Sequence, residues 1–147
     1  MINKNKDYIF LGLQIALFVA YLLPVRLDSF DVSHDFKILF RLIAFMGLTF
    51  SLLALISFDY LLSPFPSPKK NATLKTTGVY KWSRHPIYTG LILFLFAWAC
   101  SNGNYYQLLI ASAFFVLIHQ KARYEEQLLA NKFKAYKAYK KQTRMFI

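Results

Sequence analysis

Four long apolar blocks constrain the fold of this chain more than any other feature. They cover about residues 8–25, 38–62, 87–101 and 105–119. The first two reach the length of about 20 residues that a membrane-spanning helix needs, and the last two are shorter. A soluble domain of 147 residues would struggle to bury so much apolar surface, because small domains have a large surface for their volume. The blocks predict one membrane domain over residues 1–147, an all-α helix bundle with about four spans.

Two features predict how the later blocks are connected. Ser-Asn-Gly-Asn at residues 101–104 favours a tight turn, so the third and fourth blocks should form a helical hairpin. After His119 the chain is charged and lacks Gly and Pro, which predicts a separate cytoplasmic helix over about residues 121–141. The apolar side of that helix, lying on the membrane surface or on the protein, would carry Leu128, Leu129, Phe133, Tyr136 and Tyr139.

The charges between the blocks predict an orientation in the membrane. Residues 26–37 carry three aspartates against two basic residues, whereas residues 63–86 carry five basic residues and no acid. The segment from Gln120 carries eight more basic residues. Because cytoplasmic loops collect Lys and Arg, both termini are expected in the cytoplasm. The short loops suit a prokaryotic plasma membrane.

Two other interpretations of these features are less favourable. The net charge of +11 is also typical of nucleic-acid-binding proteins, but here the basic residues flank the apolar blocks, so no nucleic-acid partner is expected. Lys4 and Lys6 precede the first block as in a signal peptide. That block ends in Leu-Leu-Pro-Val without a small-x-small cleavage site, which predicts a retained first span.

The segment from Thr77 to Gly90 is the first candidate for a functional site. Pro86 suits the first position of a helix, whose unpaired N–H groups favour an anion. Arg84 and His85 add positive charge at the same place, and three aromatic residues lie close by in sequence. These types are also common at membrane interfaces, so an interfacial anchor is the alternative explanation.

The adjacent pair Glu125 and Glu126 is the second candidate. These are the only two glutamates in the chain, and they follow the fourth block. Lys121 lies four residues before Glu125, so an ordinary helix-surface ion pair is the alternative explanation, worth about 0.2–0.5 kcal/mol. Lys before Glu is the less favourable order for such a pair.

Both candidates resemble motifs of one enzyme group. Residues 77–80, Thr-Gly-Val-Tyr, followed by Ser-Arg-His-Pro-Ile-Tyr-Thr-Gly at residues 83–90, are similar to the G-x-Y…R-H-P-x-Y-x-G signature of isoprenylcysteine carboxyl methyltransferases and phospholipid methyltransferases. The Glu pair with Leu129, Phe133 and the two following tyrosines resembles the C-terminal motif of the same group. The resemblance covers about residues 65–144.

This resemblance implies a cofactor, S-adenosylmethionine, and a membrane lipid or lipidated substrate. The cofactor would be held at the cytoplasmic ends of the helices; the absence of G-x-G agrees with a site that is not a Rossmann fold. By position in the motifs, the cofactor-binding residues would be Ala72, Thr73, Leu74, Lys75, Tyr80, His85, Pro86, Ile87, Tyr88 and Glu125. The expected catalytic residues are Arg84 and Glu126, which would shape the site, and Lys121.

The chain departs from the family pattern at two places. Lys121 stands where the family often has an arginine that contacts a substrate carboxylate, and lysine lacks the bidentate guanidinium fork. The family usually has Gly after Phe133 and one more residue before the next Tyr, whereas this chain has only Lys134 and Ala135. A small change in the helix junction is therefore expected there.

Two further functions stay open. An NADPH-dependent reductase of the sterol-reductase type has a similar R-H-P-x-Y segment, but usually with Asn where this chain has Ile87. A membrane scaffold that has lost activity is the non-enzymatic alternative. The three histidines show no metal-ligand spacing, so no metal site is expected. The methyl acceptor and the oligomeric state stay open.

Overall fold

The computed structural model describes residues 4–25, 28–57, 65–68 and 73–147. Within these residues the chain is all-helical, which confirms the all-α part of the predicted fold class. In chain order, the elements are the helices α1 (Lys4–Leu22) and α2 (His34–Ile56), the short 3-10 helix η2 (Gly78–Lys81), and the helices α3 (Pro86–Asn102), α4 (Tyr105–Lys132) and α5 (Tyr136–Gln142).

The first three long helices match the predicted blocks, with shifted ends. α1 begins at Lys4, before the apolar run, and ends at Leu22, ahead of Pro24. α2 begins at His34 and ends at Ile56 with Ser57 as its C-cap, and the predicted extension over residues 58–62 lies outside the described residues. α3 follows its predicted bounds closely because Pro86 opens it and Gly103, with φ of 61°, ends it.

The prediction of a separate helix over residues 121–141 is wrong. α4 continues without interruption from Tyr105 to Lys132, because residues 119–132 hold good helix formers and no Gly or Pro. The break comes later, where Phe133 adopts an extended conformation and α5 begins at Tyr136. Neither Gly nor Pro stands between the two helices to explain the break. Tyr136 and Tyr139 on α5 are buried against the rest of the protein.

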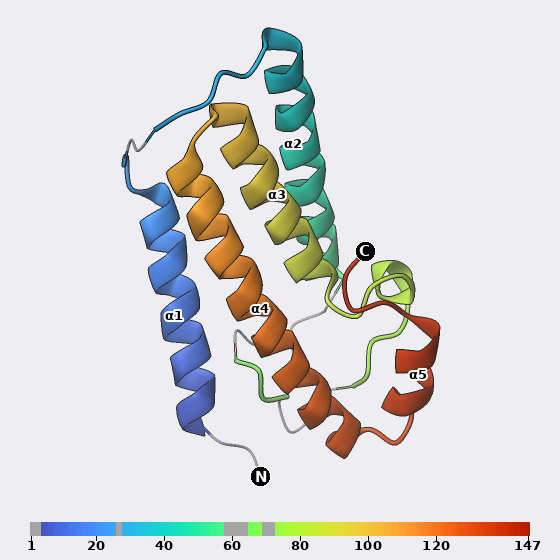
Figure 1. Cartoon of the computed structure of the whole chain (residues 1–147). Coiled ribbons are helices and arrows are strands. Elements are labelled where there is room, and N and C mark those ends of the chain that lie inside the picture. The colour runs from blue at the N-terminus through green and yellow to red at the C-terminus, as the bar shows by residue number, and fades with distance from the viewer. Residues whose placement is uncertain (1–3, 26–27, 58–64, 69–72) are drawn as a thin grey trace.

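The helices lie side by side in the order α1, α4, α3, α2 (Figure 1). α2 and α3 approach most closely at Gly47 and Gly90, where a Cβ on Gly47 would come within 2.7 Å of the Gly90 carbonyl oxygen. The Ser51 hydroxyl donates to the Ile87 carbonyl oxygen at 2.8 Å beside this crossing. Small residues on both helices therefore set the close packing of α2 against α3.

The connection between α3 and α4 is the tight turn that the sequence predicts. Gly103 takes a left-handed conformation, and the Asn104 side chain caps α4 by accepting from the Gln107 N–H at 3.1 Å. A Cβ on Gly103 would overlap the Phe30 carbonyl oxygen. The Phe30 N–H donates to the Gly103 carbonyl oxygen at 2.9 Å, so the segment between α1 and α2 packs onto the hairpin turn.

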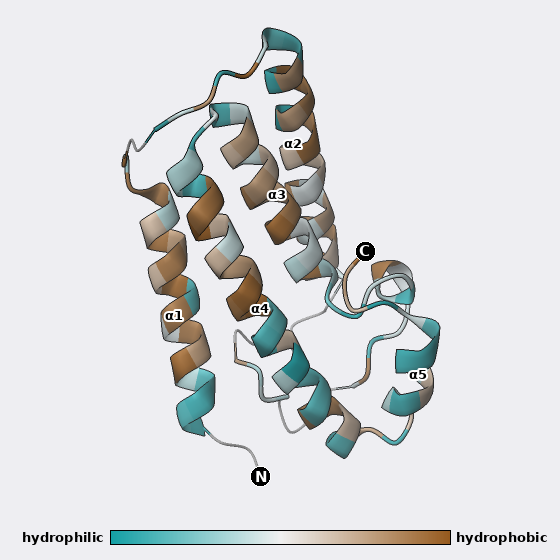
Figure 2. Cartoon of the chain, in the orientation of Figure 1, coloured by the Kyte–Doolittle hydropathy of each residue, from teal (hydrophilic) through white to brown (hydrophobic). Residues whose placement is uncertain are grey.

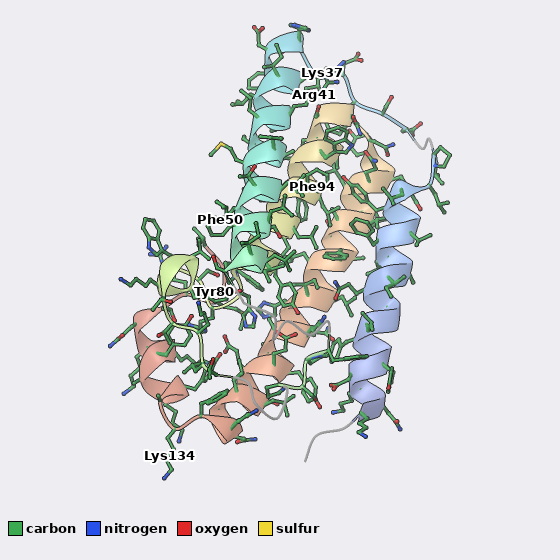
Figure 3. The ribbon with its side chains drawn as sticks, turned by 180° about the vertical axis from the view of Figure 1, so that it is seen from behind. Lys37, Arg41, Phe50, Tyr80, Phe94 and Lys134 are labelled. Carbon is green, nitrogen blue, oxygen red and sulfur yellow. The ribbon has the colours of Figure 1, made fainter. Side chains whose placement is uncertain are left out.

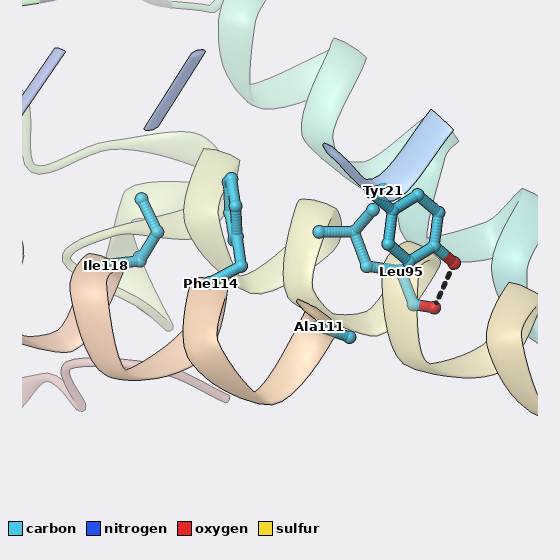
Figure 4. Close-up of a cluster of buried hydrophobic side chains, with 5 residues drawn as sticks. All are labelled: Tyr21, Leu95, Ala111, Phe114 and Ile118. Atoms are coloured by element: carbon cyan, nitrogen blue, oxygen red, sulfur yellow. Dashed lines mark hydrogen bonds between the residues drawn. The ribbon is translucent and has the colours of Figure 1, made fainter. Parts of the chain in front are cut away.

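A small core joins α1, α3 and α4. Its buried members are Tyr21, Leu95, Ala111, Phe114 and Ile118 (Figure 4). The Tyr21 hydroxyl donates to the Leu95 carbonyl oxygen at 2.7 Å, which satisfies the one polar atom that Tyr21 brings into this core.

Apolar residues cover the outer surfaces of the long helices. The hydropathy pattern places polar residues at the lower end of α1 and along the lower part of α4, with apolar residues above them (Figure 2). Among the described helices, α2 is long and apolar enough to cross a membrane, and most of its apolar side chains are exposed. Such an exposed apolar surface is typical of a protein whose surroundings are lipid.

Candidate functional site

The start of α3 brings the first candidate cluster together. Pro86 occupies the first turn, and His85 directly before it is 7% exposed. The His85 ring stacks on Tyr88, with ring centroids 5.5 Å apart and planes 9° from parallel. The Thr89 N–H donates to the His85 carbonyl oxygen at 2.9 Å, so the helix begins at this stacked pair.

Glu125 on α4 faces this stacked pair. The Tyr88 hydroxyl donates to Glu125 Oε1 at 2.6 Å, and His85 Nδ1 lies 3.4 Å from Glu125 Oε2. The Glu125 side chain keeps 15% of its surface exposed. The structure thus brings together three residues that the sequence predicts for one site, and leaves one carboxylate partly open.

Glu126 is enclosed by positive charge instead. Arg84 Nε donates to its Oε1 at 2.6 Å, and Lys140 Nζ lies 2.7 Å from its Oε2. His85 Nε2 lies 3.7 Å from Oε1, beyond hydrogen-bond distance. Burial alone would raise the pKa of Glu126, but His85, Lys140 and Arg84 together lower this pKa to about 2. Glu126 is therefore a buried carboxylate that stays ionised.

The charge of His85 follows from the same pair of carboxylates. Burial would lower the pKa of His85, but Glu125 and Glu126 outweigh burial and raise this pKa above its ordinary value. The imidazolium is thereby favoured between two acidic side chains. Its Nε2 atom has no hydrogen-bond partner among the residues that the structure describes.

Arg84 is held by the C-terminal segment as well as by Glu126. Its guanidinium donates to the carbonyl oxygens of Thr143 and of Lys140, the latter at 3.2 Å. The Arg84 backbone N–H donates to the Arg144 carbonyl oxygen at 2.9 Å. These contacts fix Arg84 in place between the start of α3, the end of α4 and the C-terminal segment.

The sequence motifs did not identify the C-terminal residues that complete this site. The His85 N–H donates to the Met145 carbonyl oxygen at 3.2 Å, and the Ser83 hydroxyl donates to the same oxygen at 3.0 Å. The Phe146 ring lies 6.2 Å from His85 and 6.1 Å from His119, between centroids. Backbone carbonyl oxygens and a single aromatic ring form no sequence motif. The positive charge of Lys140 is therefore the one feature of this segment that the sequence records.

Lys121 reaches the site from inside the bundle. It is buried on α4, its Nζ lies 5.4 Å from the centre of the Tyr88 ring, and it donates to Gln14 Oε1 on α1 at 2.7 Å. Because Lys121 is buried, the alternative of a Lys121–Glu125 ion pair on the helix surface does not apply. Gln14 was missed because a single glutamine within an apolar block gives no signal of a distant partner.

Tyr80 packs beneath the site as part of η2. It is buried, its hydroxyl donates to the Ala54 carbonyl oxygen on α2 at 3.4 Å, and its own carbonyl oxygen accepts from the Tyr139 hydroxyl at 2.6 Å. Figure 3 shows Tyr80 at the lower end of α2, on the side of α5. Tyr80 therefore links η2 to both α2 and α5.

The remaining predicted residues are placed less directly. Pro86 is buried and Ile87 is half-buried in the first turn of α3. Thr73 is exposed, whereas Leu74 and Lys75 are half-buried, and Ala72 lies outside the described residues. Contact of these residues with a cofactor stays a prediction. Within the described part of the chain, no group of three or more His, Cys, Asp or Glu residues could hold a metal ion.

Comparison with known families gives one match. The family model described as phospholipid methyltransferase matches residues 38–136, which is more than half of the chain and contains residues 77–90 and the Glu125–Glu126 pair. No curated protein and no solved structure matches the chain. The match begins at α2, so α1 and the C-terminal residues that contact Arg84 lie outside it.

Proposed function

The chain belongs to the phospholipid methyltransferase family, and from this premise we propose that it transfers a methyl group from S-adenosylmethionine to a membrane lipid. The observation that carries the proposal is the partly exposed carboxylate of Glu125, which accepts a hydrogen bond from Tyr88 and lies next to the imidazolium of His85. These residues come from the two motifs that resemble the methyltransferase group. They meet where α3 begins and α4 leaves the apolar part of the bundle.

The side chains at this site suit the amino acid part of the cofactor, which carries an ammonium and a carboxylate. Glu125 retains acceptor capacity beyond its bond to Tyr88, so it binds the ammonium group. Lys121 and His85 supply positive charge for the carboxylate. The Nε2 atom of His85 is buried, lacks a hydrogen-bond partner among the described residues and lies 3.7 Å from Glu126 Oε1.

The protein's own contribution to the reaction is binding and alignment. When bound, S-adenosylmethionine supplies an electrophilic methyl group on its sulfonium, so no covalent step on a side chain is needed. Holding the acceptor in line with that methyl group supplies several kcal/mol of the rate enhancement. Arg84 and Glu126 keep the start of α3 and the end of α4 at a fixed spacing, and thereby position Glu125 and His85.

We further propose four spans, formed by α1, α2, α3 and the first part of α4, in a prokaryotic plasma membrane. α1 and α3 are about 28 and 26 Å long at 1.5 Å per residue, close to the 30 Å of the hydrocarbon core. α4 is about 42 Å long, so its last third extends beyond the core. The acceptor lipid then reaches the site from the bilayer, and the cofactor from the cytoplasm.

Cofactor binding by purified protein tests the proposal. In equilibrium dialysis with labelled S-adenosylmethionine, we expect saturable binding that Glu125→Gln weakens at least about tenfold, the loss expected when a charge-assisted hydrogen bond is removed. The melting temperature should change little, because Glu125 is only partly enclosed. Asp35→Asn, an exposed carboxylate on α2, is the matched control and should bind like the parent.

The same assay separates the alternatives. Binding of NADPH without binding of S-adenosylmethionine would identify a reductase, and binding of neither would identify a scaffold. Incubation with a lipid extract and methyl-labelled cofactor, followed by separation of the lipids, then identifies the acceptor. Label in no lipid, despite tight cofactor binding, would contradict a lipid acceptor.

A further inference from the structure

An apolar groove lies between α2 and α3, away from the carboxylate pair. Its volume is about 420 Å³, within the range of ligand-binding pockets. The residues that line it include Arg41, Leu42, Phe45, Leu48, Phe94 and Trp98. Figure 3 shows Arg41 near the upper end of α2, with Phe94 below it on α3. The groove therefore runs along the outer face of the α2–α3 pair, with one cationic residue at its upper end.

Arg41 is exposed at this end, and its guanidinium makes one side-chain hydrogen bond among the described residues. Its Nε donates to the Ser101 hydroxyl on α3 at 3.2 Å, which orients the guanidinium. Within the described part of the chain, no carboxylate pairs with Arg41, and a guanidinium has four further N–H donors. Lys37, one turn earlier on α2, adds a second positive charge at the same end. The upper end of the groove thus favours an anion, and its walls favour an acyl chain.

We propose that this groove binds an anionic phospholipid, with its phosphate at Arg41 and an acyl chain along Phe45, Leu48 and Phe94. The proposal rests on the membrane placement of α2 and is independent of methyl transfer. An arginine near lipid is costly unless it meets an anion or water, so a phosphate at this depth compensates for its charge. A second copy of the chain packed groove to groove would place a second Arg41 against the first, which makes it the less favourable occupant.

Trp98 provides a direct probe because it lines the groove and is 39% exposed. The only other tryptophan is Trp82, 71% exposed next to η2, so Trp82→Phe leaves one reporter. The protein would be reconstituted in phosphatidylcholine vesicles that contain a small fraction of brominated phosphatidylglycerol or of brominated phosphatidylcholine. Bromine quenches tryptophan on contact. We expect about a fivefold preference for the anionic lipid, the effect of one basic side chain at a membrane surface.

Variants of Arg41 test the source of the preference. Arg41→Gln should abolish it, and Arg41→Lys should retain most of it. Lys134→Gln, which removes a positive charge beyond the far end of α4, is the matched control and should retain all of it (Figure 3). Equal quenching by both lipids, or a preference that survives Arg41→Gln, would overturn the proposal. Absence of quenching by either lipid, together with a cross-linked dimer, would assign the groove to a second copy.

Discussion

Two adjacent glutamates on one helix have different environments in this protein. Consecutive residues on a helix point about 100° apart, so Glu125 meets Tyr88 and His85 while Glu126 meets Arg84 and Lys140. Glu126 is fully enclosed and ionised, whereas Glu125 retains exposure and acceptor capacity. The physical difference assigns Glu126 to stability and makes Glu125 the better ligand-binding group.

The lowered pKa of Glu126 predicts an acid-sensitive contribution to stability. The pKa falls from an ordinary value of 4.5 to about 2 in the folded chain, so the contribution is complete above pH 4.5 and is lost as pH falls toward 2. At neutral pH it is on the order of 3 kcal/mol. We expect Glu126→Gln to melt well below the parent at pH 7, and the difference to shrink below pH 4.5.

Thermal melting of both proteins in detergent between pH 7 and pH 2.5 measures this effect. Asp35→Asn, at an exposed position, should show no comparable difference at any pH. A gap between Glu126→Gln and the parent that stays constant down to pH 2.5 would show that the Glu126 charge is not responsible.

At the scale of elements, the close crossing of α2 and α3 and the length of α4 position the site. α2 packs on α3 through Gly47, Gly90 and Ser51, which anchors the first turn of α3 through the Ile87 carbonyl oxygen. α4 carries Lys121, Glu125 and Glu126 past the apolar part of the bundle on one continuous helix. These contacts fix the positions of the candidate site residues on α3 and α4 relative to each other along the bundle axis.

The space around two helical glycines predicts different effects of their substitution by alanine. A Cβ on Gly90 would overlap the Gly47 carbonyl oxygen and lie 2.7 Å from the Ser51 nitrogen, so Gly90→Ala should destabilise the protein by about 1–3 kcal/mol. Gly12 in α1 has nothing within 4 Å of an added Cβ. Gly12→Ala should therefore be neutral or stabilising by up to about 1 kcal/mol, the difference in helix propensity.

Denaturation midpoints of the two variants measured side by side give the comparison. Gly90→Ala should also weaken S-adenosylmethionine binding, because the start of α3 must move. If Gly90→Ala were as stable as Gly12→Ala, the backbones of α2 and α3 would not be in contact at this crossing.

At the scale of the whole molecule, the site is assembled from distant parts of the chain. α1 supplies Gln14, the start of α3 supplies His85 and Tyr88, and α4 supplies Lys121 and the glutamates. The segment after α5 returns to the start of α3 and holds Arg84. The chain end after α5 lies next to the lower ends of α2 and α3, on the opposite side of the bundle from α1 (Figure 1).

The proposed topology predicts which surface positions face the cytoplasm. In a Cys100→Ala background without other cysteines, Asp31→Cys lies in the segment between α1 and α2, and Lys137→Cys lies on α5. Both positions are exposed. In intact bacterial cells a membrane-impermeant maleimide should label Asp31→Cys, and it should label Lys137→Cys only after permeabilisation. The reverse pattern would contradict the proposed orientation.

The sequence alone determined the features that depend on local chemistry. Apolar blocks of helical length predict the long helices, Pro86 marks the start of α3, and Asn-Gly-Asn marks the hairpin turn. The two motifs predict the residues that meet at the candidate site. They do so because a short turn between two helices brings the start of the first helix close to a later part of the second. Each of these features is decided by interactions within a few residues or by hydropathy, which a sequence records directly.

Tertiary structure alone decided the features that depend on distant partners. Nothing near Lys121 in sequence indicates that it contacts Gln14 on α1, and nothing near Arg84 indicates that the carbonyl oxygens of Lys140 and Thr143 hold it. α4 ends at Lys132 without a local breaker, beside the buried Tyr136 and Tyr139. Backbone acceptors exist at every residue, so only the path of the chain determines which of them meets a buried charge.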